Sequence, residues 1–148
     1  MGSDDLSGIV QPGRGLGSAL LADPSIAASC AEITGFSIVP GTLNVRLPAA
    51  VEWDDRWRYV PAEAMASDWH ERSGQTGYHM VDVLVAGRYR AVAFQADEPA
   101  GHGYPPDQIE LMSDTHLRSA LGLADGDPIE IAVVAVEPGA GPPRPAPG

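Results

Sequence analysis

The stretch that decides the fold is Val39-Pro40-Gly41-Thr42-Leu43-Asn44-Val45-Arg46-Leu47, which begins as a turn and ends as a strand. The Pro-Gly pair turns the chain, because proline fixes its own φ and glycine has a permissive backbone. Apolar and polar residues then alternate from position 43 to position 47, which predicts a β-strand. Thr42 and Asn44 project to the same face of that strand, because they are two residues apart. Two neutral oxygens side by side suit a Mg²⁺ ion that takes its other ligands from water and phosphates, although an ordinary polar strand face is the better explanation of the pair taken alone.

The composition indicates one globular domain. The chain has 148 residues, 44% of them hydrophobic, which is enough for a packed core. Its net charge of −11 argues against non-specific binding to nucleic acid or to an anionic membrane, since neither offers a partner for carboxylates. The single cysteine, Cys30, excludes an internal disulfide and a cysteine-rich zinc site. No segment is long and apolar enough to span a bilayer, and Asp23-Pro24 interrupts the region closest to a signal peptide, so a cytoplasmic protein is expected.

The strand pattern predicts a mainly β fold. Residues 78–85 and 88–95 are rich in β-forming residues and meet at Ala86-Gly87, which predicts a hairpin. Shorter strands are expected at residues 19–21, 109–112 and 129–136. Many short strands without a regular βαβ alternation favour a small, closed or nearly closed β-barrel.

Capping residues predict two helices and their boundaries. Asp23 can cap a helix that has Pro24 in its first turn and Gly35 at its end. Ser113 or Asp114 can cap a second helix that runs to about residue 121. Residues 51–77 indicate a short strand or loop followed by a weak helix over 61–72. The expected domain is 8–136, between a flexible N-terminus (1–7) and a disordered tail rich in proline and glycine (137–148).

A glycine-rich loop, Gly13-Arg14-Gly15-Leu16-Gly17-Ser18, precedes the first of these helices. Its three glycines allow backbone N–H groups to approach an anion closely. The loop lacks the Gly-Lys-Ser/Thr ending of a Walker loop, and its spacing does not fit the dinucleotide fingerprint. Taken alone, the stretch is better explained as a plain flexible loop than as a phosphate site.

In combination with the stretches at 40–47 and 109–127, this loop carries a resemblance to a known family. The sequence resembles the CTP-dependent riboflavin kinases of archaeal type. The matching pieces occur in the family's order between about residues 8 and 136, and residues 53–77 match poorly. These pieces are Gly13–Gly17, Gly35-Phe36, Pro40–Leu47, Ile109–Leu111, Leu117-Arg118 and Leu121–Asp127.

The resemblance implies a small β-barrel of the cradle-loop, Greek-key-like type with two or three short helices. It implies transfer of the γ-phosphoryl group of CTP to the ribityl 5′-hydroxyl of riboflavin, which gives FMN and CDP. Thr42 and Asn44 would hold Mg²⁺, and Gly103 and Glu110 would bind the acceptor. The nucleotide-binding residues that it implies are Gly13, Arg14, Gly15, Leu16, Gly17, Ser18, Thr115, His116, Leu117 and Arg118.

The chain departs from the family's pattern at three positions. Leu16 stands where the family usually has an acidic residue, Gly103 where it usually has threonine, and Asp114 where it has proline. Two alternatives therefore stay open: a CTP-dependent kinase of another small alcohol, and a non-catalytic module that binds a nucleotide or a flavin. A DNA-binding barrel is disfavoured by the negative charge and the lack of a basic face.

No catalytic base is identified by the pattern. Asp82 and Glu98 are candidates, and each is also explained as a solvated charge. The four histidines have no metal-ligand spacing. Phosphoryl transfer depends on positioning and on neutralising the developing charge more than on covalent chemistry, so the metal and phosphate ligands carry the hypothesis. The oligomeric state stays open.

Overall fold

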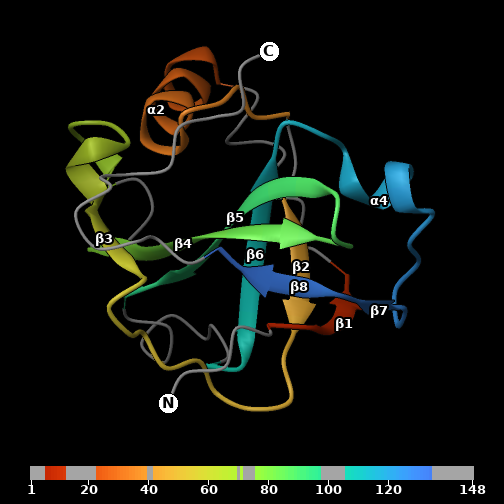
Figure 1. The fold of residues 1–148 in the computed structure, drawn as a ribbon. Coiled ribbons are helices and arrows are strands. Elements are labelled where there is room, and N and C mark those ends of the chain that lie inside the picture. The colour runs from red at the N-terminus through yellow and green to blue at the C-terminus, as the bar shows by residue number, and fades with distance from the viewer. Residues whose placement is uncertain are drawn as a thin grey trace.

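The computed structural model describes residues 6–12, 23–39, 42–69, 71, 76–97 and 106–134 (Figure 1). Element labels follow the figure. The strands are β1 (Gly8–Gln11), β2 (Leu43–Arg46), β3 (Arg58–Pro61), β4 (Gly77–Val85), β5 (Tyr89–Ala96), β6 (Gln108–Ser113), β7 (Pro128–Ile129) and β8 (Ile131–Val133). The helices are α2 (Pro24–Thr34), α4 (Leu117–Leu121) and the 3₁₀ helix η1 (Ala62–Ala64).

The eight strands of the described residues form one antiparallel sheet that closes on itself. The strand order is β3-β4-β5-β6-β2-β1-β7, and β8 pairs with β4. Glu130 alone separates β7 from β8, so one short segment passes from pairing with β1 to pairing with β4. This change of partner closes the sheet, and the mainly β, barrel-like fold expected from the sequence is confirmed.

The prediction of one continuous terminal strand at 129–136 is therefore wrong, because the described part of this segment is divided between β7 and β8. The backbone N–H of Ala86 donates to the carbonyl of Glu130, whereas the N–H of Ile131 donates to Ser7 Oγ. The ladder to β1 ends at Ile129 and the ladder to β4 begins at Ile131. Ile129, Ile131 and Val133 alternate with Glu130 and Ala132 as in one continuous strand, so the sequence pattern does not reveal the division.

Alternation along the strands divides the apolar side chains between two clusters. Inward residues such as Val45, Ile109 and Val83 fill the barrel, and they are at most 1% exposed. Outward residues of β4, β5 and β6, namely Met80, Val92 and Met112, pack instead against Ile26 and Cys30 of α2. Helix α2 thus covers part of the outer face of the sheet, at the upper end of the view in Figure 1.

Helix α2 begins and ends where its capping residues predict. The Asp23 carboxylate accepts a hydrogen bond from the backbone N–H of Ser25 at 3.0 Å, and Pro24 occupies the first turn. Gly35 ends the helix with a φ of 86°, which is the left-handed conformation that glycine adopts without strain. The predicted helix is confirmed.

The predicted hairpin is also confirmed. Strands β4 and β5 pair from Tyr78 opposite Ala96 to Val85 opposite Tyr89. Ala86 and Gly87 both have positive φ, 54° and 65°, as a type I′ turn requires. The turn matches the right-handed twist of the two strands.

Two expectations about helices need correction. Helix α4 begins at Leu117 and is capped by His116, not by Ser113 or Asp114. The helix expected over 61–72 is interrupted in its described part: Pro61 ends β3, Ala62–Ala64 form η1, and helical conformation returns at Trp69 and Glu71.

Candidate functional site

Three neighbouring strands, β1, β2 and β6, each place one polar residue side by side. Gln11 at the end of β1 lies opposite Asn44 near the start of β2, and Asn44 lies opposite Glu110 in β6. Directly opposed residues of antiparallel strands project to the same face. Gln11, Asn44 and Glu110 therefore form a polar row on the outer face, beside the part that α2 covers.

Thr42 joins this row through its hydroxyl group. Thr42 Oγ1 donates to Glu110 Oε1, with 2.8 Å between the oxygens. Asn44 is 8% exposed, and its Oδ1 accepts a hydrogen bond from Gln108 Nε2 at 3.3 Å. The structure thus brings together the two residues predicted to bind metal and the predicted acceptor residue Glu110.

The donor set fits Mg²⁺, which prefers hard oxygen ligands. Because the Thr42 hydroxyl donates its proton to Glu110, its oxygen keeps lone pairs for a cation. The Asn44 carbonyl oxygen has two lone pairs, one more than its bond from Gln108 uses. Within the described ranges, no three His, Cys, Asp or Glu side chains gather into a metal site.

The segment after β6 lies against the end of β1. Arg118 Nη2 donates to the carbonyl of Gln11 at 3.5 Å and forms an ion pair with Asp125 at 3.0 Å. Gln11 lies two residues before Gly13, so Arg118 of α4 contacts the strand that precedes the glycine-rich loop in the sequence. The predicted nucleotide residues of α4 and the root of the predicted phosphate loop are neighbours.

The predicted nucleotide residues of this segment have different environments. Leu117 is 5% exposed and packs into the barrel core, so its side chain faces away from any ligand. His116 Nδ1 accepts from the backbone N–H of Ser119 at 3.3 Å, which caps α4. Thr115 Oγ1 donates to Asp114 Oδ1 at 3.3 Å. Gly13, Arg14, Gly15, Leu16, Gly17, Ser18 and Gly103 lie outside the described residues.

Sequence reasoning missed one cation beside the site. Arg90 Nε of β5 lies 2.8 Å from Asp114 Oδ2, and its guanidinium carbon lies 4.7 Å from the centroid of the Phe36 ring. Its Nη1 is buried and has no hydrogen-bond partner among the described residues. Arg90 thus holds together β5, the segment after β6 and the segment that leads into the Pro-Gly turn. No local pattern marks this role, because its partners are distant in the chain.

A second polar cluster lies where β5 ends. His79 Nε2 lies 2.7 Å from Asp97 Oδ1, and Thr76 Oγ1 donates to Asp97 Oδ2 at 3.0 Å. The hydrogen bond from His79 lowers the pKa of Asp97 below its usual 3.8, partial burial opposes this shift, and the bond from Thr76 adds to it. Trp53 stacks on the His79 ring with 3.6 Å between centroids. The cluster fixes the chain directly before residues 98–105, which include Gly103.

Asp82, one of two candidate bases, has a structural partner. Its Oδ1 lies 3.2 Å from Arg58 Nη1, across the pairing of β3 with β4. Its carboxylate is therefore ion-paired and lies outside the polar row. The other candidate, Glu98, lies outside the described residues.

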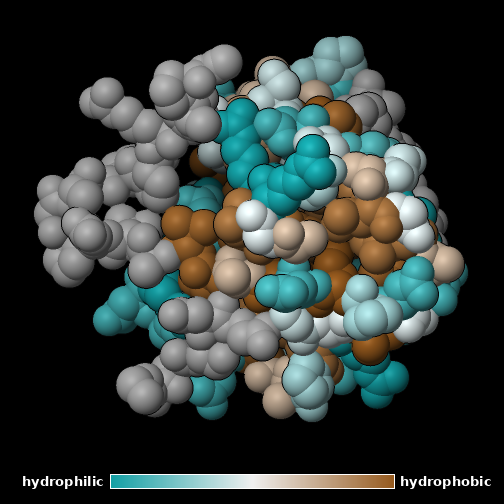
Figure 2. Space-filling view, turned by 45° about the vertical axis from the view of Figure 1, so that its right-hand side comes forward, coloured by the Kyte–Doolittle hydropathy of each residue, from teal (hydrophilic) through white to brown (hydrophobic). Residues whose placement is uncertain are grey.

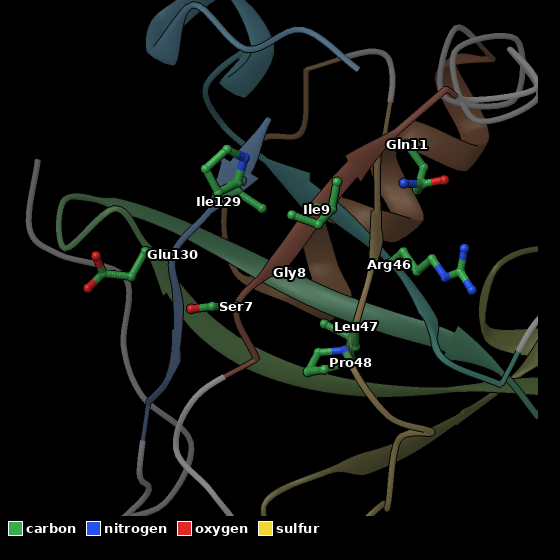
Figure 3. Close-up of a pocket in the computed structure, with 10 residues that line it drawn as sticks. Ser7, Gly8, Ile9, Gln11, Arg46, Leu47, Pro48, Ile129 and Glu130 are labelled. Carbon is green, nitrogen blue, oxygen red and sulfur yellow. The ribbon is translucent and has the colours of Figure 1, made fainter. Parts of the chain in front are cut away.

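A shallow groove runs along β1, β2 and β7 on the outer surface (Figure 3). Glu130 and Arg46 stand on opposite sides of β1 in this view, with Ile9 between them. Ile9 is 41% exposed. The space-filling view turns this side of the molecule forward and shows apolar residues among polar ones (Figure 2). Gln11 belongs both to the groove and to the polar row, so the two features adjoin.

The helices of the described residues are all too short or too polar to cross a lipid bilayer.

Comparison with known proteins gives several relatives of the same name. The chain is 34% identical over 136 residues to "Riboflavin kinase" of Methanospirillum hungatei JF-1, covering 86% of this chain and 57% of the relative. It is 30% identical over 132 residues to "Riboflavin kinase" of Methanoculleus marisnigri, covering 86% and 56%. It is 29% identical over 133 residues to "Riboflavin kinase" of Methanococcoides burtonii, covering 87% and 56%. The chain therefore spans just over half the length of these relatives.

A family model of riboflavin kinases matches the residues that form the barrel. The model labelled CTP-dep_RFKase, described as "Domain of unknown function DUF120", matches residues 10–133. This range includes all the described strands except the start of β1, and it contains the polar row of Gln11, Asn44 and Glu110. With this match over most of its length, the chain belongs to the family of CTP-dependent riboflavin kinases.

Proposed function

We propose that the protein transfers the γ-phosphoryl group of CTP to the 5′-hydroxyl of riboflavin, giving FMN and CDP, with the help of Mg²⁺. The observation that carries the proposal is the contact of Thr42 with Glu110 on the face that also presents Asn44. It places candidate metal ligands beside a carboxylate that can accept hydrogen bonds from an alcohol. Family membership supplies the choice of CTP and riboflavin.

On the donor side, the chain's own residues position phosphates. Thr42 and Asn44 would hold the metal through neutral oxygens, so these two ligands themselves add no negative charge against the triphosphate. When bound, Mg²⁺ neutralises charge that develops on the transferred group. The glycine-rich loop follows β1 in the sequence, and its three glycines would allow backbone N–H groups to approach the phosphates closely. Backbone donors and a metal allow a chain with net charge −11 to bind a polyanion.

On the acceptor side, Glu110 holds the alcohol. Its carboxylate accepts from Thr42 and, with two oxygens, can accept from hydroxyls of the ribityl chain too. Glu110 and Asn44 are opposite each other in the ladder, so the acceptor's terminal hydroxyl comes next to the metal ligands. Such positioning converts an encounter of two substrates into reaction within one complex.

A panel of acceptors tests this assignment and its nearest alternative. The alternative is a CTP-dependent kinase of another small alcohol, which the glycine at position 103 favours because the family usually has threonine there. The protein is incubated with CTP, Mg²⁺ and either riboflavin or one of several polyols and nucleosides, and CDP release is followed. Release above the acceptor-free background with riboflavin alone supports the proposal.

The other outcomes separate the remaining hypotheses. CDP release with a different alcohol and not with riboflavin would show that the acceptor is that alcohol, and the proposed use of CTP as donor would stand. Binding of CTP or FMN in calorimetry, without CDP release from any acceptor, would identify a binding module and contradict the proposed catalysis.

A further inference from the structure

An aromatic side chain stands next to Glu110 on the same face of the sheet. Phe94 of β5 lies directly opposite Glu110 of β6 in the ladder. Opposed residues of antiparallel strands have Cβ atoms about 5 Å apart and project to the same face. Phe94 is partly exposed, whereas the next outward residue of the same strand, Val92, is fully buried under α2. The polar row of the site therefore continues into an aromatic ring that a ligand can reach.

Two further aromatic residues support Phe94 from the side. The ring of Tyr78 meets the ring of Phe94 nearly perpendicularly, at 84° and with 6.0 Å between centroids. Trp69 is 2% exposed, and its Nε1 donates to the Tyr78 hydroxyl at 2.8 Å. Edge-to-face aromatic pairs are favourable arrangements, and the buried tryptophan fixes Tyr78 in its place. The Phe94 ring is thus packed on one side by Tyr78 and by the apolar cluster under α2, and its partly exposed side stays open to a ligand.

The spacing along the row matches a ligand that has a ring at one end and a reacting hydroxyl at the other. Asn44, Glu110 and Phe94 lie on three neighbouring strands, so Asn44 and Phe94 are separated by two strand spacings, roughly 10 Å. A short polyol chain fits between them and passes over Glu110. Hydroxyl groups along such a chain can donate to the Glu110 carboxylate.

We propose that the planar ring system of the acceptor stacks on Phe94, and that Glu110 binds the polyol chain between that ring and the metal ligands. This inference rests on the proposed function and adds to it a residue that selects the acceptor. The ligand class is a polyol attached to a flat, extended aromatic ring. A ring stacked on Phe94 gains contact area and aromatic interaction that a simple polyol lacks. This binding surface lies on the sheet, and it needs no side chain from residue 103, where the chain has glycine.

The test compares conservative substitutions at Phe94 with a matched substitution elsewhere on β5. Phe94→Leu keeps apolar bulk and removes the aromatic ring, and Phe94→Tyr keeps the ring. Tyr89→Leu is the control, because Tyr89 lies at the other end of the same strand and packs on the opposite face, against the barrel core. Riboflavin affinity is measured by the quenching of flavin fluorescence, and CTP affinity by calorimetry in the presence of Mg²⁺.

The inference predicts that Phe94→Leu weakens riboflavin binding by on the order of 10-fold, as expected for the loss of one stacking partner. Phe94→Tyr and Tyr89→Leu retain the wild-type affinity for riboflavin, and all variants retain the wild-type affinity for CTP. Unchanged riboflavin affinity in Phe94→Leu would overturn the role of Phe94 and leave the proposed function intact. An equal loss of CTP affinity would mean that Phe94 supports the fold and not the ring. A wild-type protein that does not bind riboflavin would overturn both proposals.

Discussion

The hydroxyl of Thr42, directly before β2, donates a hydrogen bond to the Glu110 carboxylate on β6. The two oxygens are 2.8 Å apart, although the residues are 68 positions apart in the chain. The bond joins the residue predicted to bind metal to the residue predicted to bind the acceptor. It also fixes the direction of the Thr42 proton, which leaves the oxygen available to a cation. The two halves of the proposed reaction therefore meet at one side-chain contact.

Removing both candidate metal ligands is expected to abolish turnover and leave the fold intact. In the variant Thr42→Ala with Asn44→Ala, we expect kcat to fall by at least about 100-fold, since even residues that only support metal ligands cost up to that much. Thr42→Ser, which keeps the hydroxyl, is the control and should retain activity. Circular dichroism checks the fold. Full activity of the folded double variant would contradict the assignment of the metal site.

The Arg90–Asp114 ion pair is expected to stabilise the segment after β6. Its Nε–Oδ2 distance is 2.8 Å, and the Arg90 side chain also packs over Phe36. In a double-mutant cycle of Arg90→Met and Asp114→Ala, we expect a coupling energy of about 1 kcal/mol in urea unfolding.

A second ion pair of the chain provides the matched control for this cycle. Arg46 and Asp107 approach only to 3.4 Å, and the Arg46 side chain is 66% exposed. Solvent screens such a pair, so its cycle should give a coupling near zero. Equal coupling in the two cycles would show that Arg90 has no special structural role.

Position-by-position patterns predicted the local elements well. Asp23, Gly35 and the Ala86-Gly87 pair act through neighbours in the sequence, and the structure confirms the helix and the hairpin that they predict. Alternation from 43 to 47 likewise predicted β2 and the common face of Thr42 and Asn44. These features depend on short-range geometry, which one sequence contains.

Distant partners decided the features that the sequence did not predict. Ser113 and Asp114 do not cap α4, because the Ser113 hydroxyl donates to the carbonyl of Arg90 and the Asp114 carboxylate pairs with the Arg90 side chain. The helix therefore begins later, at Leu117. The terminal strand divides at Glu130 because its two halves pair with β1 and β4. The neighbourhood of Phe94 and Glu110 depends in the same way on the β5–β6 register.

Acid is expected to weaken the protein partly through Asp97. Because the folded-state pKa of Asp97 is lower than its unfolded value, its ionised form stabilises the fold fully above the unfolded value, near 3.8. That contribution is lost as the pH falls through the folded-state pKa. Urea unfolding at pH 6 and pH 3 should therefore show a larger loss for the wild type than for Asp97→Asn, by about 1 kcal/mol or less because the site is partly exposed. Identical losses in the two proteins would contradict this role of the His79–Asp97 contact.

Replacing Ala86 is expected to stabilise the hairpin. Ala86 has a φ of 54°, a conformation that costs residues with a Cβ atom free energy, whereas asparagine tolerates it. Ala86→Asn should raise the free energy of unfolding by about 0.5–1 kcal/mol. Gly87→Ala, which places a Cβ at a φ of 65°, should lower it. Thermal unfolding measures both changes, and a less stable Ala86→Asn protein would refute the explanation.

The most direct measurement of the proposed activity is the formation of FMN. The purified protein is incubated with riboflavin and Mg²⁺, with either CTP or ATP as the phosphoryl donor, and the products are separated by chromatography. We predict FMN and CDP in equal amounts with CTP, and little FMN with ATP or in the presence of a chelator. Absence of FMN with CTP, from a folded protein that binds both substrates, would contradict the proposed function.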